Sequence, residues 1–250
     1  MIDAAALLPP GTTLTTWALM GSLVLIGACL QGIGGIGFAM FSAPIAALVF
    51  PAMVPGPLLL LGGLVSVMAA LREPAAIHWL LARHCIGGRC LGAVLAGGLM
   101  WVLPAKPLAI AFALSMLIGV GLALAGWRIV PDRRSAWVAG TVSGVMGTIT
   151  SAGAPPLGLL TQSLPPPTIR STIGTIIALG SAASMLMLAT TGHFSLRQVA
   201  LGMVLIPWIW AGFAISSRLA RHISAAGMRR LLLGLVAASA LVVLGKALLA

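Results

Sequence analysis

The stretch Gln31-Gly32-Ile33-Gly34-Gly35-Ile36-Gly37, which reads QGIGGIG, interrupts two long apolar runs. Four of its seven residues are glycines, and each glycine costs a helix about 1 kcal/mol relative to alanine. An unbroken helix over residues 13–50 would be about 55 Å long at 1.5 Å per residue, nearly twice the thickness of the hydrocarbon core of a bilayer. The stretch therefore predicts a helix break, after which a shorter helix returns as the second arm of a hairpin.

The composition places the chain among polytopic membrane proteins. Hydrophobic residues make up 60% of it and charged residues 7%, whereas soluble domains carry about 25% charged residues. Uncharged runs such as 91–105 and 107–126 approach the ~20 apolar residues that span a bilayer. The net charge of +11 comes from arginines in short clusters between apolar runs, which is typical of cytoplasmic loops rather than of a nucleic-acid-binding surface.

Apolar segments divide the chain into two similar halves. All of them are expected to be helices, because an open strand cannot satisfy its backbone hydrogen bonds in lipid. They span residues 13–31, 36–50, 54–71, 86–103 and 107–126, then 136–150, 153–164, 169–190, 198–217 and 230–249. The second segment of each half is short, follows a Gly-rich or Ser/Thr-rich break and precedes a Pro-rich corner. This order predicts two repeats offset by about 115 residues, comprising residues 1–127 and 128–250.

The number of segments and the placement of arginine predict the topology. Since each repeat has an odd number of segments, the second repeat starts on the opposite side of the membrane and is inverted. With the N-terminus outside, the inside loops carry Arg72, Arg83, Arg89, Arg128, Arg133, Arg134, Arg170, Arg218, Arg221, Arg229 and Arg230, and the outside carries Lys106, Arg197 and Lys246. This distribution obeys the positive-inside rule. We expect a protein of the bacterial inner membrane with both termini outside, anchored by its first helix because Met1 to Pro10 lack the basic start of a cleaved signal peptide.

The two breaks predict a binding site for a small anion. Unwound backbone at membrane depth is tolerated where it lines a cavity, and a helix N-terminus carries about half a unit of positive charge. Inverted repeats would bring the two breaks together, with helix N-termini near Ile36 and Gly153 aimed at the ligand. The candidate residues are Gln31, Gly32, Gly34, Gly35, Gly37, Thr148, Thr150, Ser151, Gly153, Gln162, Ser171, Thr172, Arg89 and Arg170. The alternative for each hydroxyl is a hydrogen bond to its own helix, and for each glycine close helix packing.

Other chemistries are disfavoured by the sequence. GIGGIG has no preceding strand and no acidic residue about 20 positions later, both of which a dinucleotide-binding fingerprint requires. The acidic residues Asp3, Glu73 and Asp132 are terminal or lie in predicted loops, which argues against a carboxylate proton relay or a sodium site inside the membrane. The three cysteines lack metal-ligand spacing, and no catalytic constellation is present. We expect no enzymatic activity, no metal and no cofactor.

The break motifs resemble those of the sulfite exporter TauE/SafE family of membrane permeases. Gly32-Ile33-Gly34-Gly35 is similar to the family's first break, and SGVMG at 143–147 is similar to the start of the second. The corner SLPPPTIRST at 163–172 also matches, whereas TITSAGAPP at 148–156 replaces the expected Ile-Gly-Gly-Gly-Pro. The resemblance covers nearly the whole chain. It implies transport, often export, of sulfite, sulfonates or related organic acids.

The sequence therefore predicts an all-α secondary transporter that binds a small anion between its two breaks and moves it by alternating access. A small-anion channel, a carboxylate importer of the same architecture and a non-transporting membrane scaffold remain alternatives. The lipid bilayer and the anion are the expected partners, and the oligomeric state is left open.

Overall fold

A computed structural model describes residues 13–102 and 129–219, with isolated positions between 107 and 121 and between 234 and 245. Within these ranges every element is helical. The elements are α2 (Leu14–Gly34), α3 (Phe38–Val49), η1 (Pro51–Met53), α4 (Gly56–Arg72), η2 (Pro74–Ala76), α5 (Trp79–Val102), α7 (Arg133–Thr150), α8 (Ala154–Thr161), α9 (Pro166–Thr190), α10 (Leu196–Val204) and α11 (Ile206–Leu219). The predicted all-α class is confirmed. The expected segments at 107–126 and 230–249 fall largely outside the described residues.

Several of these helices are long and apolar enough to cross a membrane. In the described part of the chain α2, α5 and α9 meet that condition singly, and α10 and α11 meet it together across a bend of 43°. The bend lies next to Pro207, whose missing N–H and bulky ring interrupt a helix. Helices α3 and α4 are apolar but shorter. The chain is therefore a polytopic membrane protein.

The fourth helix begins earlier than the sequence predicts. It was expected to span 86–103, with Arg83 and Arg89 in an inside loop, but α5 begins at Trp79. Arg83 is exposed near the start of this helix, whereas Arg89 lies in its middle and is only 1% exposed. The placement of Arg89 in a loop was wrong because its charge was taken as a loop signal, although a polar partner within the protein can hold an arginine inside a bundle.

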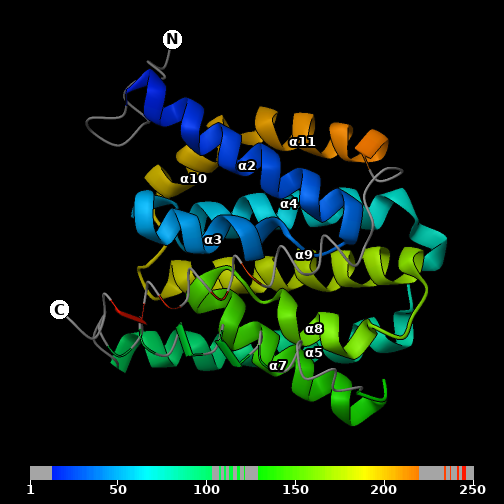
Figure 1. Cartoon of the computed structure of the whole chain (residues 1–250). Coiled ribbons are helices and arrows are strands. Elements are labelled where there is room, and N and C mark those ends of the chain that lie inside the picture. The colour runs from blue at the N-terminus through cyan, green and yellow to red at the C-terminus, as the bar shows by residue number, and fades with distance from the viewer. Residues whose placement is uncertain are drawn as a thin grey trace.

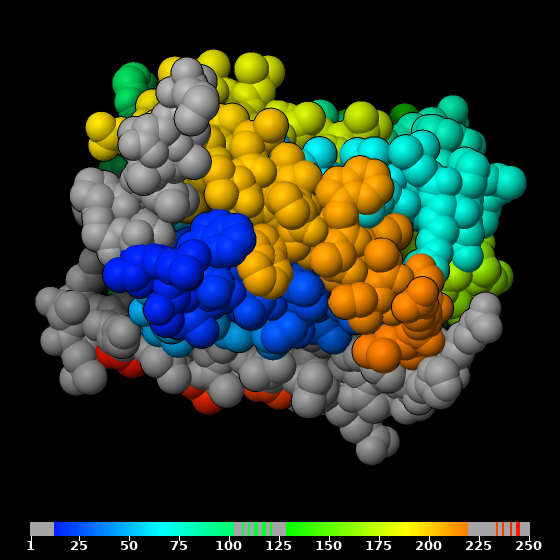
Figure 2. All heavy atoms as spheres, turned by 90° about the horizontal axis from the view of Figure 1, so that it is seen from above, coloured from blue at the N-terminus to red at the C-terminus, as the bar shows by residue number. Residues whose placement is uncertain are grey.

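Three helix pairs organise the molecule (Figure 1). Helix α2 packs along α11, α4 along α9 and α5 along α7. Figure 2 shows the first of these pairs on one face, where α2 and α11 lie side by side although they come from opposite ends of the described chain. Each pair joins one helix from the first half of the chain to one from the second half, so neither half forms a separate core.

Glycines allow α5 and α7 to approach backbone to backbone. Gly88 and Gly92 on α5 face Gly140 and Gly144 on α7, which gives each helix a Gly-x-x-x-Gly pair. A Cβ on Gly140 would lie 2.3 Å from the carbonyl oxygen of Cys85, and one on Gly144 would lie 2.4 Å from that of Arg89. Small residues of this spacing are the usual means of close helix packing in membranes.

Candidate functional site

The two predicted breaks begin with the same backbone conformation. Helix α2 ends at Gly34, and the next residue, Gly35, has a left-handed φ of 76° and donates its N–H to the carbonyl of Gln31 at 2.7 Å. Helix α7 ends at Thr150, and the next residue, Ser151, has a left-handed φ of 64° and donates its N–H to the carbonyl of Gly147 at 2.8 Å. In each case the next helix begins three residues later, at Phe38 and at Ala154. Both helix breaks that the sequence predicts are therefore present, and each is a short turn.

Ser151 is an unusual residue for this conformation. Residues with a Cβ rarely have a positive φ, and Ser151 is the only such residue outside glycine in the described part of the chain. Its hydroxyl donates to the carbonyl oxygen of Pro55 at 2.8 Å, which ties the second break to the start of α4. The corresponding position of the first break is Gly35, which has no side chain to strain. Ser151 thus makes this hydrogen bond in a conformation that is unfavourable for its residue type.

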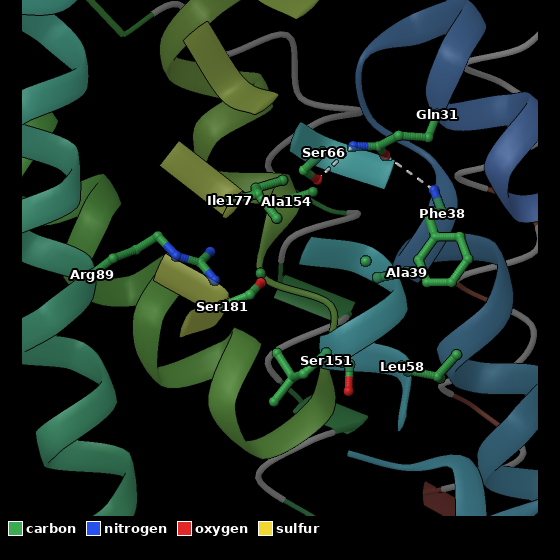
Figure 3. A pocket seen from close by; sticks show the side chains of 13 residues that line it. Gln31, Phe38, Ala39, Leu58, Ser66, Arg89, Ser151, Ala154, Ile177 and Ser181 are labelled. Atoms are coloured by element: carbon green, nitrogen blue, oxygen red, sulfur yellow. Dashed lines mark hydrogen bonds between the residues drawn. The ribbon is translucent and has the colours of Figure 1, made fainter. Parts of the chain in front are cut away.

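Gln31 closes the first break from inside the helix bundle. Its side chain is 2% exposed and bridges two elements: Nε2 donates to Oγ of Ser66 on α4, and Oε1 accepts the N–H of Phe38 at the start of α3, both at 3.2 Å (Figure 3). A polar side chain thus satisfies one of the N–H groups that a helix N-terminus leaves without an intrahelical partner. The next residue of α3, Ala39, lines the cavity described next, as Phe38 does.

One cavity brings both breaks together (Figure 3). Its volume, counted as the space that the centre of a water molecule can reach, is about 20 Å³. This is enough room for roughly one water molecule. Its walls come from α2, α3, α4, α5, the second break with α8, and α9. The lining residues are Gln31, Phe38, Ala39, Leu58, Leu59, Gly62, Ser66, Arg89, Ser151, Gly153, Ala154, Ile177 and Ser181.

Arg89 is the only charged residue among those lining residues. Its guanidinium points toward Ser181 from the side opposite Gln31 (Figure 3). Nη1 donates to Oγ of Ser143 on α7 at 2.6 Å, and that hydroxyl donates in turn to the carbonyl oxygen of Gly153 at the second break. Nε is buried and has no hydrogen-bond partner among the described residues. Nη1 of Arg89 is therefore connected to the second break through Ser143, whereas its Nε remains an unused donor.

Gly180 on α9 makes room for this guanidinium. A Cβ at position 180 would lie 1.8 Å from Nε of Arg89 and 2.5 Å from its Cδ. Gly147 and Gly153 border the guanidinium in the same way, since a Cβ there would lie 3.0 Å from Nη2 and 2.8 Å from Nη1 respectively. Three glycines from α7, the second break and α9 thus shape the space that Arg89 occupies.

The acidic residues of the described chain lie elsewhere. Glu73 forms a two-point ion pair with Arg170, with Oε1 to Nη2 at 2.6 Å and Oε2 to Nε at 3.2 Å. Asp132 caps the start of α7, where the backbone N–H and then the hydroxyl of Ser135 hold the pKa of this carboxyl below its usual range. Arg89 therefore has no carboxylate partner among the described residues. A buried charge is costly unless something pairs with it.

The second break contributes fewer backbone donors than the sequence analysis expected. After Ala154, helix α8 continues with Pro155 and Pro156, and proline has no N–H. The first turn of α8 is therefore poor in the groups that usually bind an anion at a helix N-terminus. The guanidinium of Arg89 lies at this position instead, against Ser143 and Gly153.

Of the predicted site residues, the structure brings four to the cavity: Gln31, Arg89, Ser151 and Gly153. The others do not line it: Gly32, Gly34, Gly35, Gly37, Thr148, Thr150, Gln162, Arg170, Ser171 and Thr172. The hydroxyls of Thr148, Thr150 and Ser171 donate to carbonyl oxygens of their own helices. That of Thr172 accepts the N–H of His78.

Two lining hydroxyls were missed by the sequence analysis. Ser66 and Ser181 are buried in the long helices α4 and α9, away from either break. Each is packed against a glycine of the other helix, Ser181 against Gly63 and Ser66 against Gly174. An isolated serine beside a glycine in an otherwise apolar helix was the available signal. Without knowledge of which helices pair, it does not distinguish a cavity wall from simple helix packing.

Comparison with known proteins agrees with the fold and with the break motifs. The family model described as Sulfite exporter TauE/SafE matches residues 19–243. No curated protein and no solved structure matches the chain. The matched region includes both breaks, every lining residue of the cavity and all the described helices except the first turns of α2. The chain belongs to the sulfite exporter TauE/SafE family, which consists of membrane transporters for anions of the sulfite type.

Proposed function

We propose that the chain exports a small anion such as sulfite, a sulfonate or a related organic acid, by alternating access, and that the anion binds at the cavity between the two breaks. One observation carries the proposal: Arg89 is buried, belongs to the cavity wall and has no carboxylate partner among the described residues. An anionic ligand would supply the missing charge. The family's sulfite exporters support both the ligand class and the direction.

The neutral donors around Arg89 suit a ligand that has to leave again. Ser66 and the amide of Gln31 lie on the far wall from the guanidinium, and Ser181 lies beside it (Figure 3). They can donate hydrogen bonds to an oxyanion without adding further charge attraction. Unused N–H groups at the N-terminus of α3 would add a partial positive charge on the same side. A single full charge plus neutral donors allows binding without trapping.

The packing pattern supports two inverted repeats, residues 1–127 and 128–250. In this assignment each helix of the first repeat corresponds to one of the second: α2 to α7, α3 to α8, α4 to α9 and α5 to α10–α11. The contact between α2 and α11 then corresponds to the contact between α7 and α5, and the contact between α4 and α9 corresponds to itself. The left-handed residues at the two breaks, Gly35 and Ser151, correspond under the same pairing. An internal two-fold axis in the membrane plane would have this effect.

The distribution of charge supports a cytoplasmic assignment for one end of the molecule. Helices α4 and α11 end, and α5, α7 and α9 begin, at the same end of the bundle (Figure 1). That end carries Arg72, Arg83, Arg133, Arg134, Arg170 and Arg218. The opposite end carries Arg197 at the start of α10. By the positive-inside rule the arginine-rich end faces the cytoplasm of a bacterium and the N-terminus lies outside.

The small size of the cavity supports alternating access. Space for about one water is too small for sulfite, so an anion enters only when the walls separate. The breaks are the places where this movement costs least, because α3 and α8 begin there and the chain is held there by a few side-chain hydrogen bonds, such as those of Gln31 and Ser151. Movement of the two short helices in turn would open the cavity to one side and then to the other.

The proposal is tested by anion-dependent thermal stability of the purified protein. A ligand at roughly 100 times its dissociation constant adds about 2.7 kcal/mol to the free energy of unfolding. Sulfite or a short sulfonate should raise the melting temperature of the wild type and of Arg83→Gln, which removes an exposed arginine from the same helix. The same anions should leave Arg89→Gln unchanged. Equal stabilisation of Arg89→Gln and the wild type would show that the anion binds elsewhere.

A further inference from the structure

We infer that the cavity selects anions of charge −1 over anions of charge −2. The inference rests on the proposed function and specifies its substrate class. The preferred ligands are then sulfonates and hydrogensulfite, and sulfate and fully ionised sulfite are disfavoured. The positive charge of the cavity wall and the positions of the nearest other charges set this preference.

The cavity wall holds one full positive charge. Of the residues that line it, Arg89 is ionised and the other polar side chains, Gln31, Ser66, Ser151 and Ser181, are neutral. No histidine or lysine belongs to the set. In a water-poor site, an ion pair is most stable when the negative charge of the ligand equals in magnitude the positive charge of its partner. Any further negative charge on the ligand is removed from water without a partner.

Other ionisable groups on the helices around Arg89 do not add to this charge. On α5 the nearest are the thiols of Cys85 and Cys90, and a thiol carries no positive charge in either protonation state. On α7 the ionised residues Arg133 and Arg134 lie at its first turn, ten residues or about 15 Å of helix before Ser143. On α9 the only ionised residue is Arg170, which is already paired with Glu73.

The helix N-termini do not supply a second charge either. Helix α3 offers a partial charge of about half a unit, and one of its N–H groups is already taken by Gln31. Helix α8 offers less, because Pro155 and Pro156 lack N–H groups. The positive charge of the lining residues and the two helix N-termini therefore exceeds one unit only by a fraction, which matches a monoanion better than a dianion.

The donors of Arg89 suit a sulfonate head. Nη1 is held by Ser143, while Nε is buried without a partner among the described residues and faces α9 at Gly180. When the walls separate to admit the ligand, one of its oxygens can accept from Nε, and the hydroxyl of Ser181 on the next residue of α9 can donate to a second oxygen. This arrangement uses two of the three oxygens of a sulfonate, and the carbon substituent on its sulfur can then face the apolar wall of Leu58, Leu59 and Ile177.

The test uses methanesulfonate and sulfate, which have nearly the same shape and differ by one charge. Binding of each to the purified full-length protein is measured by titration of thermal stability at constant ionic strength, with sodium gluconate as the balancing salt. Methanesulfonate should bind at least roughly tenfold more tightly than sulfate, because an unpaired buried charge costs more than the 1.4 kcal/mol of a tenfold change. Arg89→Lys, which keeps the charge, should retain the preference even if it binds both anions more weakly.

The possible outcomes distinguish a failure of the charge selection from a failure of the anion site itself. Equal binding, or tighter binding of sulfate, would overturn the charge selection and leave the anion site in place. Binding of neither anion would remove the proposed site and the selection together. If both anions bind and the preference for methanesulfonate persists in Arg89→Gln, the selection comes from another group and the assignment to Arg89 is wrong.

Discussion

Replacing Gly180 with alanine should separate the fold of the protein from its anion site. The added Cβ would lie 1.8 Å from Nε of Arg89 and 2.5 Å from its Cδ, so the side chain of Arg89 has to move. That movement breaks its hydrogen bond with Ser143, which is 2.6 Å long and made by a charged donor. Hydrogen bonds of this kind contribute about 1.5–3 kcal/mol.

The expected effects on binding and on stability differ in size. For an anion to bind as in the wild type, Arg89 must return to a position that the methyl group now occupies. The lost interaction therefore appears as a roughly 10- to 100-fold weaker affinity, at 1.4 kcal/mol per factor of ten. Stability should fall by only about 0.5–2 kcal/mol, because alanine favours a helix over glycine by about 1 kcal/mol and offsets part of the loss.

The assay is a titration of methanesulfonate against the thermal stability of Gly180→Ala, with a matched glycine as control. Gly98 on α5 is exposed and has no atom within 4 Å of the position of an added Cβ. Gly98→Ala should keep the wild-type affinity and be as stable as the wild type or slightly more so. If Gly180→Ala binds the anion as tightly as Gly98→Ala does, the guanidinium is not held in the place that the structure shows, and the reasoning from Gly180 fails.

Three further perturbations test the packing, the ion pair and the helix cap. Gly144→Val should lower the free energy of unfolding by about 1–3 kcal/mol, since the valine side chain would overlap the backbone of α5 at Arg89. Gly98→Val is the control. A melting temperature of Gly144→Val equal to that of the wild type would contradict the close packing. Glu73→Gln should lower the free energy of unfolding by at most about 1 kcal/mol, because the ion pair with Arg170 is partly exposed. The double variant Glu73→Arg with Arg170→Glu, which exchanges the two charges, should recover this stability. If instead the losses of the two single variants add up in the double variant, the two side chains are not coupled. The pKa of Asp132 is lowered by Ser135, so its ionised cap stabilises the fold above the ordinary pKa of about 3.9 and is lost as the pH falls below it. Asp132→Asn, which keeps the cap, should therefore lose less stability than the wild type on acidification, and identical pH profiles would contradict this cause.

The sequence predicted the features that depend on backbone conformation. QGIGGIG indicates a tight turn because Gly35 and Gly37 have positive φ values of 76° and 153°, which other residues rarely adopt. The equivalent turn at Ser151 was found through the order of break, short helix and Pro-rich corner, since its own residue type gives no such signal. Helix ends were predicted within a few residues where proline or glycine marks them, and missed at Trp79, where nothing does.

The cavity wall was harder to predict because it depends on which helices are neighbours. Ser66 and Ser181 look like ordinary helix residues until α4 and α9 are paired. Ser171 and Thr172 look like ligand donors until their hydrogen bonds to Pro167 and His78 are seen. Arg89 was expected both in an inside loop and as a candidate anion contact. Only the packing of α5 against α7 and α9 shows that it lies inside the bundle.

The most direct test of the central claim is sulfite efflux from proteoliposomes that contain the purified protein. Wild type, Arg83→Gln and Arg89→Gln are compared at equal protein content, with folding checked by thermal melting. The account predicts rapid, saturable efflux for the wild type and for Arg83→Gln, and efflux at the level of protein-free liposomes for folded Arg89→Gln. Wild-type efflux by folded Arg89→Gln would contradict the claim that the anion passes through the cavity at Arg89.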